Sequence, residues 1–156
     1  MTGIYIHIPF CKKACHYCNF HFSTSLLHKN EVISAIQKEI YHKSIDNNDV
    51  VSTIYFGGGT PSILDVFEIN LIIDKVYKYF KVHDDVEITI EVNPDDLSKQ
   101  KIIDFSETKV NRISIGVQSF IDKELKIMNR AHDSNKAMKS IELSKKYFNN
   151  ISIDLM

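Results

Sequence analysis

The sequence predicts an α/β fold in which helices connect the strands of a parallel sheet. Strand-like apolar segments alternate with helical segments along the whole chain, and such connections place successive strands parallel to one another. The composition, with 44% hydrophobic and 25% charged residues, is typical of one globular domain of 156 residues. No linker, further repeat or compositionally biased segment interrupts the alternation.

The first elements precede a glycine-rich turn. Residues 3–9 form a predicted strand, because they are rich in Ile and end at a proline. Residues 30–45 form a predicted helix with apolar residues on one face, and Asn30 is its expected N-cap. Residues 52–56 form the second predicted strand, which leads directly into Gly57-Gly58-Gly59-Thr60-Pro61.

The middle of the chain continues the same alternation. Residues 65–80 are the clearest helix, because their apolar residues recur at helical spacing. Residues 86–92, with the sequence VEITIEV, form a strand that an Asn-Pro pair ends. Ser98 is expected to cap a short helix that reaches about residue 105, and residues 112–117 form the fourth strand.

The last elements are two helices, at 122–128 and 134–148, and a fifth strand at 151–156. Ser134 is the candidate N-cap of the second helix. The fifth strand is expected to carry apolar residues on both faces, as a buried parallel strand does. Because no covering helix follows it, we expect the chain to be the N-terminal piece of a longer α/β protein.

The charge balance and the absence of long apolar runs argue against two classes of protein. Nineteen basic and twenty acidic residues leave a net charge of −1, and Arg112 and Arg130 are the only arginines, which disfavours a nucleic-acid binder. No run reaches the roughly 18–20 apolar residues of a membrane span, and residues 1–10 lack the pattern of a signal peptide. We therefore expect a cytoplasmic protein. Lys12 and Lys13 are expected to be a solvated pair, and compensation of the charge of neighbouring cysteine thiolates is the alternative.

The three cysteines of the chain lie within one short loop after the first strand. Cys11, Cys15 and Cys18 form a C-x3-C-x2-C spacing, and their odd number argues against a disulfide framework. Three thiolates can ligate three corners of a [4Fe–4S] cluster and leave one iron open. A structural zinc site, with His16 or His21 as the fourth ligand, is the alternative, and unliganded thiols are a third possibility.

Other residues that could bind a ligand follow the ends of the predicted strands. The turn at 57–61 exposes backbone to a ligand, but it is not a phosphate-binding P-loop because no Gly-Lys-Ser/Thr follows. Glu91, Gln118 and Asp154 lie at or after the ends of apolar strands, where an uncompensated carboxylate is costly. Because parallel strands end at one edge of a sheet, these groups are expected to share a site there.

The motifs together resemble the radical S-adenosylmethionine (SAM) superfamily, through CxxxCxYC after the first strand and GGGTP after the second. The strings YIHIPFC, YFGGGTPS, EVNPDD, NRISIGVQSF, NRAH and ISIDLM resemble the oxygen-independent coproporphyrinogen III oxidase branch, and within it most closely the haem chaperone HemW group. The resemblance implies a partial (β/α)6 barrel. Residues 1–156 would then be an incomplete core domain, truncated in the fifth strand, without the sixth βα unit and the C-terminal domain.

The resemblance also implies two cofactors and the residues that bind them. Cys11, Cys15 and Cys18 would bind a [4Fe–4S] cluster, whose open iron would chelate the amino and carboxylate groups of SAM. The positions that match the SAM site of the family are Tyr5, Tyr17, Gly58, Gly59, Thr60, Glu91, Gln118, Arg130 and Asp154. The glycines would receive the methionine part of SAM, and the aromatic Tyr17 would reach its adenine side.

The implied chemistry is cleavage of SAM by one electron from the reduced cluster, which yields methionine and a 5′-deoxyadenosyl radical. In the oxidases this radical starts the decarboxylation of propionate side chains in porphyrin biosynthesis. Two departures favour the chaperone group over the oxidases. Phe20 stands where the oxidases carry a fourth cysteine, and the first cysteine comes as early as residue 11, without their long N-terminal extension.

The resulting prediction is a radical SAM protein of the HemW type that binds and delivers haem. Its partners would be haem or a porphyrin, haem-accepting proteins and an electron donor. An oxygen-independent coproporphyrinogen III oxidase is the first alternative, and a structural metal-binding module is the second. The HNxxYW motif of the chaperone group would lie beyond residue 156.

Overall fold

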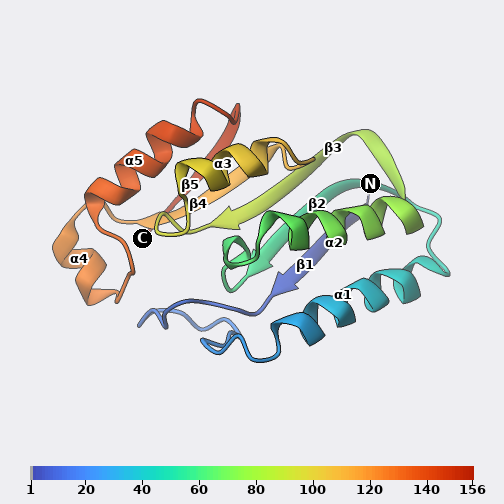
Figure 1. The fold of residues 1–156 in the computed structure, drawn as a ribbon, viewed down its shortest axis with the longest axis horizontal. Helices are drawn as coiled ribbons and strands as arrows, with labels where there is room; N and C mark the ends of the chain where they lie inside the picture. The colour runs from blue at the N-terminus through green and yellow to red at the C-terminus, as the bar shows by residue number, and fades with distance from the viewer. Residues whose placement is uncertain (1) are drawn as a thin grey trace.

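A computed structural model describes residues 2–156, which form one five-stranded sheet and its connecting helices (Figure 1). The strands follow one another across the sheet in sequence order, and every neighbouring pair is parallel. They are β1 (Thr2–Ile8), β2 (Val50–Gly58), β3 (Lys81–Val92), β4 (Arg112–Gln118) and β5 (Asn150–Leu155). The predicted α/β class and parallel sheet are confirmed. β2 and β3 begin earlier than predicted, because Val50 and Val51 pair with Lys81 and Val82.

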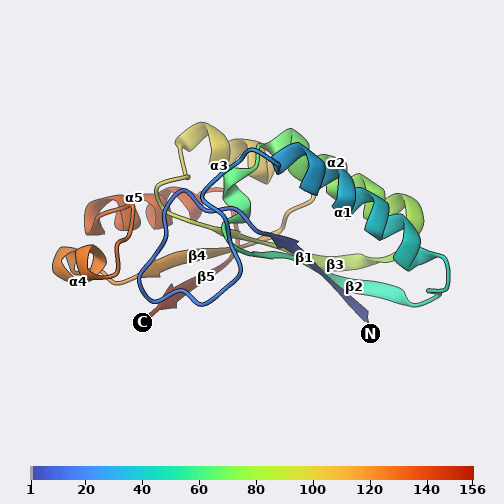
Figure 2. The ribbon, with the colours of Figure 1, turned by 90° about the horizontal axis from the view of Figure 1, so that it is seen from below.

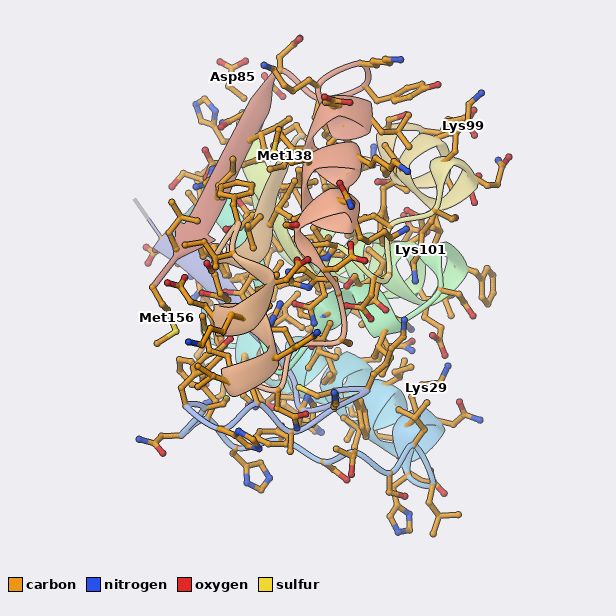
Figure 3. All side chains as sticks on the ribbon, turned by 90° about the vertical axis from the view of Figure 1, so that its left-hand side faces the viewer. Lys29, Asp85, Lys99, Lys101, Met138 and Met156 are labelled. Atoms are coloured by element: carbon orange, nitrogen blue, oxygen red, sulfur yellow. The ribbon has the colours of Figure 1, made fainter. Side chains whose placement is uncertain are left out.

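The helices cover one face of the sheet, as Figure 2 shows. They are α1 (Lys29–Ser44), α2 (Val66–Tyr79), α3 (Lys99–Ser106), α4 (Asp122–Ile127) and α5 (Ser134–Ser144), with a short 3-10 turn, η1 (Pro61–Ile63). In Figure 3, Lys29, Lys99 and Lys101 lie on the helical side of the molecule, and Met156, which follows β5, lies on the other side. Within residues 2–156, no helix has the length and apolar character needed to cross a membrane.

The helix starts test the capping predictions. Ser98 caps α3 as predicted, since its hydroxyl accepts a hydrogen bond from the backbone of Lys101 at 3.1 Å. The prediction for Asn30 is wrong, because α1 begins one residue earlier and Asn30 lies inside its first turn. The prediction for Ser134 is also wrong. Asp133 is the N-cap of α5, and its carboxylate accepts the third backbone N–H of the helix at 2.7 Å.

Alternation along the strands gives the sheet one apolar and one polar face. The apolar face packs under the helices, with Ile6, Phe56, Ile90, Ile113 and Ile151 in one row of paired residues. On the opposite face, Ser114 pairs with Ser152, and Gly116 pairs with Asp154. The prediction that the fifth strand is apolar on both faces is therefore wrong. No helix of residues 2–156 covers the second face, so polar side chains are tolerated there.

Candidate functional site

An open cavity of about 730 Å³, solvent-open space included, lies at the carboxyl ends of the strands. Its lining includes every residue that the sequence predicted for the cluster and SAM, with one exception. The predicted residues that line it are Cys11, Cys15, Tyr17, Cys18, Gly58, Gly59, Thr60, Glu91, Gln118, Arg130 and Asp154. Five separate strand ends thus contribute to one site, as expected for a parallel sheet.

Tyr5 is the exception, because the structure places it outside the cavity lining. It lies on the edge strand β1 and is 58% exposed. Its ring stacks on Tyr55 at a centroid distance of 6.1 Å, and its hydroxyl lies 3.3 Å from Nδ1 of His7. Tyr55 in turn donates a hydrogen bond to Glu91 at 2.8 Å. Tyr5 therefore contacts the site through Tyr55.

The cysteine loop, residues 9–28, connects β1 to α1 and lies at the cavity end of the sheet (Figures 1 and 2). Its start is held by two backbone hydrogen bonds, from Cys11 N–H to the Ser23 carbonyl at 3.0 Å and from Ser23 N–H to the Pro9 carbonyl at 2.8 Å. The hydroxyl of Thr60 donates to the Cys11 sulfur at 3.4 Å. The glycine turn after β2 and the first cysteine are thereby in direct contact.

The glycines of this turn allow close packing within the protein itself. The backbone N–H of Gly59 donates to the Ile8 carbonyl at 2.9 Å. A Cβ atom at Gly59 would lie 2.7–2.9 Å from backbone atoms of Ile8 and Phe10, which is closer than real side chains come. Gly58 has a φ of 109°, and a Cβ there would overlap the His7 ring. The turn therefore needs glycine for its approach to the end of β1, while it also lines the cavity.

Two further contacts hold the cysteine loop, one on each side. Lys12 forms ion pairs with Asp95, at 3.3 Å, and with Asp96, whose side chain is only 1% exposed. Both Lys12 and Lys13 are exposed, as expected for a solvated pair, but Lys12 is also held by these two carboxylates. On the other side, the Asn129 amide donates to the Ala14 carbonyl at 2.7 Å. The loop is thus fixed between the β3–α3 connection and the end of α4.

Arg130 donates hydrogen bonds to four groups of the site. Its Nη1 donates to the Tyr17 hydroxyl at 3.1 Å and to the Cys15 sulfur at 3.5 Å. Its Nη2 donates to the Asn93 side-chain oxygen at 2.7 Å and to the Gly116 carbonyl at 2.6 Å. The guanidinium thereby supplies positive charge beside a cysteine sulfur. Burial raises the pKa of Tyr17 to about 12 against the positive charge of Arg130, which lowers it, so the Tyr17 hydroxyl stays protonated at neutral pH.

Glu91 is the half-buried acid of the cavity. Its carboxylate accepts hydrogen bonds from the Tyr55 hydroxyl at 2.8 Å and from the Gly58 backbone N–H at 3.2 Å. Burial raises the pKa of Glu91, and the neighbouring charge of Asp154 raises it further, while these two hydrogen bonds lower it. A cationic ligand group in this cavity would favour the ionised form of Glu91 and would be bound by it.

Asp154 and Gln118 close the side of the cavity formed by β4 and β5. The Ser114 hydroxyl donates to the Asp154 carboxylate at 3.1 Å. Gln118 has a φ of 67°, in the left-handed region that few side chains adopt, and the pairing of β4 with β5 shifts at this point. Local strain of this kind is often found at binding sites.

The donor set at the cavity consists of thiols, which are the ligands of an iron–sulfur cluster. Cys11, Cys15 and Cys18 are free thiols of intermediate burial on one loop. Across residues 2–156, no group of three or more His, Cys, Asp and Glu side chains is arranged around one point. Each thiolate of a cluster can bind a different iron, so the sulfur atoms do not have to meet at one point.

Some site residues were not predicted from the sequence. Asn93 donates from its amide to the Thr60 hydroxyl at 3.1 Å and accepts from Arg130, so it connects two predicted residues. Tyr55 and Ser114 hold the two carboxylates of the cavity. Asn93 follows the strand VEITIEV directly, and this position at a strand end was the available signal. Tyr55 and Ser114 lie inside strands, so the strand register determines which neighbouring side chains they meet on the sheet.

Comparison with known proteins shows the family to which the chain is similar. A model of the Radical SAM superfamily matches residues 5–156. The haem chaperone HemW of Buchnera aphidicola (subspecies Acyrthosiphon pisum) is 38% identical over 157 residues, covering 99% of this chain and 42% of the relative. HemW of Bacillus subtilis is 36% identical over 160 residues, covering all of this chain and 42% of the relative. The chain thus spans less than half the length of these two relatives.

Among solved structures, coproporphyrinogen III oxidase (HemN) from Escherichia coli, described as a radical SAM enzyme, superposes with a TM-score of 0.89 at 29% identity. The match covers 98% of this chain and 36% of the oxidase. The resemblance and the partial-barrel fold class predicted from the motifs are therefore confirmed.

Proposed function

This chain belongs to the radical SAM superfamily, and we propose that its cavity binds a [4Fe–4S] cluster and SAM. The observation that carries the proposal is the convergence of three free thiols, the glycine turn and the Arg130 guanidinium on one cavity. Membership of the family makes these two cofactors the expected ligands, and the donor set accommodates both. The carboxyl ends of parallel strands are also where α/β proteins bind ligands.

Different residues of the cavity are suited to bind different groups of the two cofactors. Cys11, Cys15 and Cys18 would hold the cluster and leave one iron without a protein ligand. When bound, the reduced cluster would supply one electron to the sulfonium of SAM. The carboxylate of Glu91 is suited to bind a ligand amino group, and the Arg130 guanidinium is suited to a ligand carboxylate or to a thiolate sulfur. The protein's contribution is to orient the ligand and to exclude water around it.

For the whole protein we propose that it binds haem and delivers it to acceptor proteins in the cytoplasm, with electrons supplied by a donor protein. The relatives named haem chaperone HemW support this proposal. Phe20 supports it as well, because a phenylalanine lines the cavity where the oxidases carry a fourth cysteine.

A second candidate is the activity of an oxygen-independent coproporphyrinogen III oxidase, which removes carboxyl groups from porphyrinogen propionates. The observation that favours it is the TM-score of 0.89 against the oxidase from Escherichia coli. Both functions would use the same cavity for the cluster and SAM. They would differ in the tetrapyrrole that the whole protein binds, which is haem for the chaperone and a porphyrinogen for the oxidase.

The first experiment is anaerobic reconstitution with iron and sulfide, followed by iron, sulfide and SAM-binding analysis. Full cluster occupancy with SAM binding supports the proposal. Replacing Cys15 by Ala should abolish cluster retention, because two protein thiolates rarely hold a [4Fe–4S] unit. His21→Ala is the control, since this exposed side chain in the same loop is outside the thiol set. A zinc-containing, colourless protein would overturn the proposal.

The second experiment separates the two functions. The reconstituted whole protein is titrated with haem by absorption spectroscopy and is assayed in parallel for turnover of coproporphyrinogen III. Stoichiometric haem binding and transfer to an acceptor without turnover supports the chaperone. Turnover of the porphyrinogen supports the oxidase instead.

A further inference from the structure

A continuous chain of hydrogen bonds crosses the polar face of the sheet and ends at the cavity. The guanidinium of Arg112 donates from Nη2 to the Ser152 hydroxyl at 3.0 Å. The Ser152 hydroxyl donates to the Ser114 hydroxyl at 2.9 Å. The Ser114 hydroxyl donates to the Asp154 carboxylate, with distances of 3.1 Å and 3.4 Å to its two oxygens. Of these four residues, only Asp154 lines the cavity.

The direction of this chain is determined by its two ends. A guanidinium can only donate hydrogen bonds, so Ser152 must accept from Arg112 and use its own proton toward Ser114. An ionised carboxylate can only accept, so the Ser114 proton is directed toward Asp154. Hydrogen bonds that point the same way between a cation and an anion polarise one another and become stronger. This hydrogen-bond relay, from Arg112 through Ser152 and Ser114 to Asp154, therefore favours one orientation of the Asp154 carboxylate.

Asp154 needs such support because of its place in the fold. It lies near the end of β5, an edge strand of residues 2–156, and its side chain is exposed. The register of the sheet brings Ser152 beside Ser114, so both hydroxyls lie on the face from which Asp154 extends. Neither Arg112 nor Arg130 forms an ion pair within 4.0 Å among the described residues, so Arg112 is linked to carboxylates through hydroxyl groups alone.

The same arginine begins a second branch that leads away from the cavity. Its Nη1 donates to the Thr89 hydroxyl at 3.2 Å, and Thr89 donates to Glu87 at 3.2 Å. Glu87 does not line the cavity. The two branches share one cation and end on different carboxylates, so the Thr89 branch provides a matched control.

We propose that Arg112, Ser152 and Ser114 are positioning residues that hold the Asp154 carboxylate in place for the ligand of the cavity. This inference rests on the proposed function for its ligand, SAM, but the relay itself is a property of the protein. Breaking any one link should release the carboxylate. A serial relay also predicts that breaking two links has no more effect than breaking one.

The experiment measures two quantities in anaerobically reconstituted protein, the dissociation constant for SAM and the midpoint of urea unfolding, with the iron content as a check on the cluster. Ser114→Ala and Ser152→Ala should each weaken SAM binding by about tenfold, within the range for coupled neighbours. The double variant should be no weaker than either single variant. In an Asp154→Asn background, Ser114→Ala should change SAM affinity by less than about twofold. Thr89→Val should leave SAM affinity unchanged.

The outcomes separate the relay from the proposed function. Additive losses in SAM affinity, or an equal loss in Thr89→Val, would overturn the positioning role, because general damage to the sheet would explain both. The unfolding midpoints of Arg112→Gln, Asp154→Asn and their double variant test the relay without SAM. Non-additive midpoints support the relay, and additive midpoints overturn it. A wild-type protein with a full cluster and no SAM binding would overturn the proposed function and the positioning role for SAM together.

Discussion

The ion pair between Lys12 and Asp96 should hold the cysteine loop against the body of the protein. The Asp96 side chain is 1% exposed, and its carboxylate accepts a hydrogen bond from the hydroxyl of Ser62, which is fully buried, at 2.7 Å. Its other oxygen pairs with the ammonium of Lys12, the residue after Cys11. In Asp96→Asn the side chain keeps an oxygen for Ser62 but loses the charge opposite Lys12.

The expected cost follows from the burial of the two partners. Loss of a hydrogen bond to a charged, buried group costs about 1.5–3 kcal/mol. The side chain of Lys12 is 49% exposed and retains Asp95 at 3.3 Å, so water and Asp95 compensate in part and place the cost near the lower end. We expect Asp96→Asn to lower the free energy of unfolding by about 2 kcal/mol, or roughly 4–8 °C in Tm for a chain of this length.

The assay is thermal unfolding followed by circular dichroism, together with the iron content after anaerobic reconstitution. Iron retention should fall in Asp96→Asn, because the first cysteine adjoins the released lysine. Asp95→Asn is the matched control, since it removes the same charge from the neighbouring residue, whose side chain is 16% exposed, and leaves the closer partner of Lys12 intact. Equal destabilisation by the two variants, or none by Asp96→Asn, would refute this account of the loop.

Three further predictions concern the cavity. The raised pKa of Glu91 means that the folded protein binds more protons than the unfolded chain above pH 4.5, so this residue's contribution to stability falls as pH rises through its folded-state pKa. Urea unfolding from pH 4.5 upward should therefore show that the free energy of unfolding of the wild type falls relative to that of Glu91→Gln. A difference between the two proteins that does not change with pH would contradict the argument from burial. Arg130→Lys should cost about 1–3 kcal/mol in urea unfolding, because one ammonium cannot reach all four acceptors of the guanidinium. Gly59→Ala should destabilise by about 1–3 kcal/mol, because its Cβ meets backbone atoms, whereas Gly3→Ala meets chiefly the movable Thr53 hydroxyl and should cost less by the same measurement.

The order of elements and the place of the site could be predicted because both depend on local patterns. Period-two and helical spacing of apolar residues located the five strands and the helices between them. Parallel strands end at one edge, so the cysteines, Glu91 and Asp154 could be placed together before their contacts were known. The N-caps of α1 and α5 were missed because adjacent polar residues compete for that position, and the backbone path decides between them.

The contacts that hold the site together could be found only from the tertiary structure. Lys12 and Asp96 are far apart in sequence, and neither residue type indicates its partner. The alternation in ISIDLM already contained the polar face of β5, but a buried parallel strand was expected to be apolar on both sides. By itself the sequence determined the chemical groups available to the site and the strand ends that carry them. Which hydroxyl bonds which carboxylate was decided by the register of β4 against β5, because a shift of one residue would turn Ser152 and Asp154 to the opposite face.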